Sequence, residues 1–188
     1  MNITYRKATV KDIDSLIKIR LDYLEDDKGC SLTNSETTAI TTHLRNYIPK
    51  ELGNKFITYI AEVNNEIISA VFMMIIEKPA NTSFLAGKTA YVLNVFTYPD
   101  HRKKGIATKL LEMAIEDAKY MEMPYIELAA SESGKPLYER LGFVRNENPK
   151  YTEMKLDLSS KPKEPNAITK EQIMNFYLRK FSKNSEGK

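Results

Sequence analysis

Positions 102–105 combine three positive charges with a glycine, directly before an amphipathic run of helical spacing. The first N–H groups of a helix have no acceptor within it, and the helix dipole makes that end positive. Such an end binds anions, usually phosphate, and Gly105 would let an oxygen approach the backbone without a Cβ in the way. We therefore predict a phosphate site, the alternative being a solvated basic turn. The glycine spacing fits neither the nucleotide-hydrolase loop nor the dinucleotide loop, so neither a nucleoside triphosphate nor NAD is predicted.

Two stretches resemble the signatures of the GNAT acetyltransferase superfamily. Residues 102–107, RKKGIA, match its R/Q-x-x-G-x-G/A signature, and the preceding YVLNVFTYPDHR resembles its fourth strand. Further on, SGKPLYERLGF (133–143) resembles its second signature, in which a tyrosine precedes Leu-Gly-Phe. The resemblance covers about residues 1–158 and implies the GNAT fold, acetyl-CoA as co-substrate and acetyl transfer to an amine by direct attack.

The resemblance also implies roles for individual residues. Tyr138 matches the family tyrosine that acts as general acid toward the sulfur, and an ordinary phenol, with a pKa of about 10, holds its proton at neutral pH. In the family, the loop amides hold the pyrophosphate of coenzyme A, and the open fourth strand pairs with the pantetheine arm. Ser131 stands where many members have an asparagine that contacts pantetheine. The implied coenzyme-binding residues are Val95, Phe96, Thr97, Arg102, Lys103, Lys104, Gly105, Ile106, Ala107, Thr108 and Ser131.

The base that takes the amine proton is not assigned by the resemblance. Many members carry a glutamate on the fourth strand, whereas this chain has Asn94, which cannot accept a proton at neutral pH. Glu127, Glu132 and His101 stay open as bases, as do water and simple desolvation of the amine.

The acceptor is expected to be a small amine or a peptide amine. In this family the first two helices and their loop help to form the acceptor side. Glu25, Asp26 and Asp27 fall in the loop predicted after the first helix. These carboxylates either attract a cationic amine or form a solvated helix end.

Apolar spacing predicts the elements that must position these residues. A helix ends near Leu24, and further helices cover about 36–51, 105–121 and 136–141. We expect an α/β (α+β) fold in which helices flank a mixed, mostly antiparallel central sheet of six to seven strands. The strands are predicted at 3–7, 56–63, 66–76, 89–98, 125–130, 143–145 and 150–158.

The chain divides into an acetyltransferase-like domain at 1–158 and a C-terminal extension at 159–188. Residues 159–168 have the proline, lysine and serine content of a linker, and 169–182 read as an amphipathic helix. This helix could meet a membrane surface, but packing on its own domain or on a second subunit, as a homodimer, is favoured.

The composition is that of an ordinary globular protein, with 42% hydrophobic and 28% charged residues and a net charge of +3. A single cysteine, Cys30, excludes an internal disulfide and a multi-cysteine metal site, so no metal is expected. The N-terminus lacks the apolar core of a signal peptide, so we expect a cytoplasmic protein that does not bind a membrane. The net charge is too small to indicate nucleic-acid binding, so no nucleic-acid partner is expected. The competing functions are a non-catalytic CoA-binding sensor, which would not need Tyr138, and a nucleic-acid module built on residues 101–104.

Overall fold

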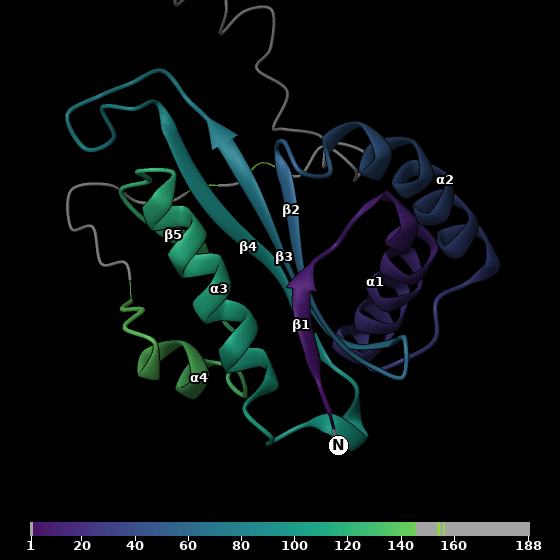
Figure 1. Cartoon of the computed structure of the whole chain (residues 1–188). Coiled ribbons are helices and arrows are strands. Elements are labelled where there is room, and N and C mark those ends of the chain that lie inside the picture. Colours follow the sequence, from purple (N-terminus) through teal and green to yellow (C-terminus); the bar gives the residue numbers. More distant parts are fainter. Residues whose placement is uncertain (1, 146–153, 155, 157–188) are drawn as a thin grey trace, which may run out of the picture. The chain divides into compact units, whose positions relative to one another are not determined.

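The computed structural model describes residues 2–145, 154 and 156 (Figure 1). The expected strand at 150–158 lies outside the described residues apart from 154 and 156, and so do the domain boundary at 158 and the helix at 169–182. The described elements are β1 (Thr4–Lys7), η1 (Val10–Asp12), α1 (Ile13–Lys28), α2 (Asn34–Glu51), β2 (Phe56–Val63), β3 (Glu66–Glu77), β4 (Lys88–Thr97), η2 (Pro99–His101), α3 (Ile106–Tyr120), β5 (Ile126–Leu128) and α4 (Lys135–Arg140).

The strands form one mixed sheet in the order β1-β2-β3-β4-β5. The first three pairs are antiparallel, and β4 pairs with β5 in parallel. The described residues form five of the expected strands, and the strand expected at 143–145 is wrong because these residues are not in strand conformation. The predicted turn at Asn64-Asn65 is present, and both residues take the positive φ that a tight hairpin turn requires.

Helices cover both faces of the sheet (Figure 1). Buried residues of α3 pack on side chains such as Tyr59, Val71 and Val92, which share one face. Buried residues of α1 and α2 pack on Phe56 and Phe72, which point the other way. Because successive strand residues point to opposite faces, the nearly continuous apolar runs of β2 and β3 serve both cores.

The first helix extends further than its apolar spacing indicated. α1 ends at Lys28 rather than near Leu24, and Gly29 closes it in the left-handed conformation, its N–H donating to the carbonyl of Glu25. Glu25, Asp26 and Asp27 therefore lie in the last helical turn and not in a loop.

The entry to α1 is fixed by Asp12. Asp12 and Thr9 form the predicted capping box, and the Asp12 carboxylate also receives two hydrogen bonds of 2.8 Å from Arg6. The bonds from Arg6 are the largest cause that holds the pKa of Asp12 at about 2. This buried contact ties β1 to the start of α1.

Candidate active site

The outer edge of β4 is open beyond its first residues. β4 pairs with β5 only over Ala90–Val92. A β-bulge follows, because Phe72 of β3 lies opposite Asn94 while Met73 lies opposite Val92, which leaves Leu93 as the extra residue. Among the described residues no strand pairs with the outer edge of β4 after Val92, so its outward N–H and C=O groups are available to a ligand.

This edge borders a cavity of about 1130 Å³. Small-molecule sites commonly enclose about 300–1000 Å³, so the space suits a large, elongated ligand. Every predicted site residue lines it except Lys104. The walls are the last turn of α1, the edge of β4, the loop before α3, residues 129–131 and α4.

The loop before α3 presents a row of free amides. Lys103 and Gly105 take φ values of 60° and 74°, the left-handed conformation that occurs in backbone sites for anions. In the described part of the chain, none of the backbone N–H groups of residues 103–108 donates to a protein acceptor, and the first helical bond comes from Lys109. Six successive free amides at the positive end of a helix are a ready anion site.

Two of the three cations of this loop, Arg102 and Lys104, differ in direction. The Arg102 guanidinium turns toward α1 and donates to both carboxylate oxygens of Asp26 at 3.0 Å, while its Nε donates to the carbonyl of Thr97 at 2.8 Å. Lys104 Nζ donates to the carbonyl of Asp100 at 2.7 Å, away from the cavity. Arg102 thus links the anion loop to the last turn of α1.

Tyr138 belongs to α4 and lines the cavity from there. Burial, and secondarily Tyr23, raises the pKa of Tyr138 above its ordinary value of 10.0. A Cβ at Gly134 would lie 3.1 Å from the Tyr138 ring and 3.2 Å from Ser131 Oγ, so a larger residue there would require these two side chains to shift by a few tenths of an ångström. Ser131 Oγ accepts a hydrogen bond of 3.2 Å from the Gly134 N–H and therefore supports the turn before α4.

Two residues of the cavity wall did not emerge from the sequence patterns. Tyr23 lines the cavity from α1, and Asn94, which the sequence marked only as the missing base, lines it from β4. Asn94 is 1% exposed; its Oδ1 accepts a hydrogen bond of 3.0 Å from Arg20 and its Nδ2 has no acceptor. The Arg20 guanidinium lies 5.2 Å from the centre of the Tyr23 ring. Arg20 and Tyr23 are three residues apart on one helix, and this spacing was the sequence feature that could have placed their side chains side by side.

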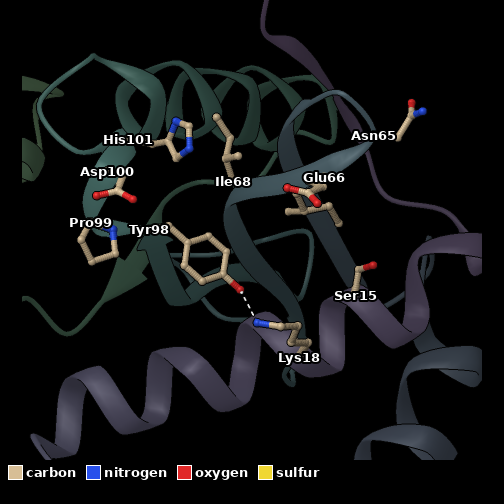
Figure 2. A pocket seen from close by; sticks show the side chains of 10 residues that line it. Ser15, Lys18, Asn65, Glu66, Ile68, Tyr98, Pro99, Asp100 and His101 are labelled. Carbon is tan, nitrogen blue, oxygen red and sulfur yellow. Dashed lines mark hydrogen bonds between the residues drawn. The ribbon is translucent and has the colours of Figure 1, made fainter.

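The candidate bases separate in space. Glu127 lies 3.6 Å from Lys78, and neither it nor Glu132 lines the cavity. His101 lines the cavity, and its Nδ1 is buried without a partner. It also borders a second hollow of about 640 Å³, where Lys18 Nζ donates a hydrogen bond of 3.1 Å to the Tyr98 hydroxyl oxygen (Figure 2).

No group of three or more His, Cys, Asp or Glu among the described residues is arranged to hold a metal ion. No helix in this part of the chain is long and apolar enough to cross a membrane.

An open-edged mixed sheet with an anion loop before α3 is the arrangement that the resemblance to GNAT acetyltransferases implies. A model of the acetyltransferase (GNAT) domain matches residues 54–145. A predicted acetyltransferase from Clostridium acetobutylicum, solved with acetyl-CoA, is 30% identical, with a TM-score of 0.68 over 82% of this chain and 96% of that one. The chain belongs to the GNAT acetyltransferase superfamily and is an acetyl-CoA-dependent acetyltransferase.

Two further relatives extend the comparison. An N-alpha-acetyltransferase from Saccharolobus solfataricus is 29% identical over 150 residues, which are 77% of this chain and 81% of that protein. A GCN5-related N-acetyltransferase from Ralstonia eutropha is 22% identical, covers 85% of this chain and all of that one, and has a TM-score of 0.70, which supports the fold alone.

Proposed function

We propose that the protein transfers the acetyl group of acetyl-CoA to a primary amine by direct attack, the acceptor being a small amine or a peptide amine. The observation that carries the proposal is the row of free amides at residues 103–108, which opens on the same cavity as Tyr138 and the unpaired edge of β4. The N-alpha-acetyltransferase relative favours the α-amine of a peptide as acceptor.

The proposal assigns roles to the coenzyme-binding residues that the family resemblance implies. The amides of 103–108 hold the pyrophosphate, with Lys103 adding charge at the cavity wall. The backbone of Val95, Phe96 and Thr97 pairs with the amide-bearing pantetheine arm as an added strand would. Ser131, whose hydroxyl already accepts from Gly134, borders the arm on the far side.

When bound, acetyl-CoA supplies a thioester whose carbon–sulfur bond breaks as the amine nitrogen bonds to the acetyl carbon. An outward N–H of β4 between Val95 and Thr97 stabilises the negative charge that grows on the carbonyl oxygen. Tyr138 Oη gives its proton to the sulfur, and its raised pKa keeps it protonated at neutral pH. The proton released by the amine passes to water.

Calorimetric titration of the purified protein with acetyl-CoA, with CoA and ATP as comparison ligands, tests the proposal. We expect saturable binding of acetyl-CoA and CoA and none of ATP, followed by CoA release when amines are supplied. Exposed Cys30 is replaced by serine to remove its background thiol. Absence of acetyl-CoA binding at low salt would refute the site, while binding without turnover on any amine would leave a CoA sensor in its place.

A further inference from the structure

The three adjacent carboxylates at the end of α1 have different partners. Glu25 accepts a hydrogen bond of 2.9 Å from the backbone N–H of Leu32, and so holds the turn after α1. Asp26 is paired with Arg102. In the part of the chain that the structure describes, Asp27 makes no hydrogen bond or ion pair, and it lines the cavity. Asp27 is therefore the cavity carboxylate that is available to a ligand.

Tyr23 stands one helical turn before Asp27 and lines the same wall. Its ring is held between the Arg20 guanidinium at 5.2 Å and the edge-on ring of Phe96 at 6.3 Å. Tyr23 and Tyr138 line the same cavity although they come from α1 and α4. Burial and Asp27 raise the pKa of Tyr23, so it stays a neutral phenol whose oxygen can accept a hydrogen bond.

Asn94 supplies the third feature. Its Nδ2 is buried without an acceptor, and an unsatisfied buried donor costs about 1–3 kcal/mol. Because Asn94 lines the cavity beside the β4 bulge, a ligand oxygen that reaches Nδ2 would remove this cost. A carbonyl oxygen meets that need, whereas an alkylamine carries no such group.

The absence of a carboxylate at position 94 also limits which kind of amine can react, because no base on β4 can remove its proton. At pH 7.5 an α-amine, whose pKa is about 7.7–8.0, is neutral in about a quarter of molecules or more, whereas a lysine amine, with a pKa of about 10.4, is neutral in roughly one of a thousand. Since only the neutral amine attacks, a site without a strong base on β4 favours the α-amine.

We propose that Tyr23, Asp27 and Asn94 form the acceptor subsite, and that its ligand is the free α-amine of a peptide. Asp27 attracts the ammonium, the Tyr23 oxygen accepts from the nitrogen, and Asn94 Nδ2 donates to the first peptide carbonyl. The subsite deepens the proposed function and depends on it. A single available carboxylate in the described cavity wall does not favour a polyamine, which would carry several charges.

The first test compares acceptors on the full chain at saturating acetyl-CoA. The probes are a short peptide with a free α-amine, a peptide with a blocked N-terminus and one lysine, and 1,4-diaminobutane. Rates between pH 6 and 9 are expressed as kcat/KM per neutral amine, which removes the difference in amine pKa. We expect the α-amine to be preferred at least about 10-fold even then. An equal or better rate with the diamine overturns the proposal.

The second test uses Asp27→Asn and Tyr23→Phe, each with a matched control. Asp14→Asn changes an exposed aspartate on the same helix, and Tyr120→Phe changes a tyrosine that is 89% exposed. Asp27→Asn should raise KM for the peptide about 10-fold with kcat little changed, and Tyr23→Phe should raise it about 3- to 10-fold. Neither control should do so.

A binding measurement separates the subsite from the chemistry. Titrating the peptide into protein saturated with CoA should show binding that Asp27→Asn weakens about 10-fold, while acetyl-CoA affinity is unchanged. If acetyl-CoA binds and the peptide is acetylated but Asp27→Asn has no effect on KM or on this binding, the subsite is wrong and the proposed function stands. If acetyl-CoA does not bind at all, the proposed function itself fails.

Discussion

Replacing Asp26 by asparagine is expected to tighten the binding of acetyl-CoA. In the free protein the guanidinium of Arg102 is bonded to both oxygens of Asp26, so a phosphate that recruits Arg102 must compete with this carboxylate. Asparagine keeps the size of the side chain and removes the charge. The bond from Arg102 Nε to the carbonyl of Thr97 is left in place, so the arginine stays beside the loop.

The exposure of the pair sets the magnitude. The Arg102 and Asp26 side chains are 43% and 48% exposed, and ion pairs of this kind are worth about 0.2–1 kcal/mol. Both bonds to Asp26 come from one nitrogen, Arg102 Nη2, so the pair is not the two-nitrogen fork that binds carboxylates most strongly. The dissociation constant of acetyl-CoA should therefore fall by up to about 5-fold, and the gain should shrink as salt screens the charges.

Isothermal titration calorimetry at low and at physiological salt measures the effect. Asp100→Asn is the control, because it removes a charge near the loop without breaking an ion pair. In an Arg102→Ala background the Asp26→Asn gain should vanish, as a double-mutant cycle requires. Weaker binding in Asp26→Asn, or an equal gain in Asp100→Asn, would refute the competition and leave the pair as a support for α1.

Three other changes test the site and the fold. Gly105→Asp should abolish calorimetric binding of acetyl-CoA, because it adds negative charge to the anion loop at a φ of 74°. The space around Gly105 would accept a Cβ, so Gly105→Ala should keep measurable affinity for acetyl-CoA. Equal affinity in the two variants would contradict the anion site at this loop. Tyr138→Phe should lower kcat by about 100-fold and leave acetyl-CoA affinity within about 2-fold. Because its raised pKa keeps Tyr138 protonated, ionisation of Tyr138 should not lower the wild-type kcat below pH 10. A fall in kcat near pH 8 that is absent from Tyr138→Phe would oppose the role of Tyr138 as general acid. Asp12→Asn should lower the free energy of unfolding in urea by about 2 kcal/mol at pH 7, because the pKa of Asp12 in the folded protein, about 2, lies below the ordinary 3.8. This loss of stability should fade as the pH drops from about 4 to 2. A loss that does not depend on pH would point to packing instead of charge.

The elements were largely readable from the sequence because their patterns are local. The capping box at Thr9 and Asp12, the turn at Asn64-Asn65 and the spacing of α3 each depend on a few neighbouring residues, and all are present. The bulge at Leu93 was not readable, since it depends on how β4 and β3 are aligned across the sheet. That bulge changes the register of β4 where it leaves β5, so the open edge was expected through resemblance and not through the strand's own residues.

Side-chain direction explains why the charges of the site could not be assigned in advance. Arg102 belongs to the loop signature, yet its guanidinium turns to α1, where it donates to Asp26 and to the Thr97 carbonyl. Lys104 turns away to the Asp100 carbonyl. The amides of the loop, which no side chain can redirect, are therefore the more dependable part of an anion site than the cations that first mark it in the sequence.

The end of α1 makes the same point for the acceptor side. Read as a loop, Glu25–Asp27 form one negative patch with one role. In a helix each residue is turned by about 100° from the last, so three neighbours face three directions. Glu25 accepts a hydrogen bond from the Leu32 amide, Asp26 pairs with Arg102, and Asp27 lines the cavity. Gly29, a residue that commonly closes a helix in the left-handed conformation, was the signal that the helix continues through these carboxylates. Continuing the helix is what frees Asp27 alone for an incoming amine.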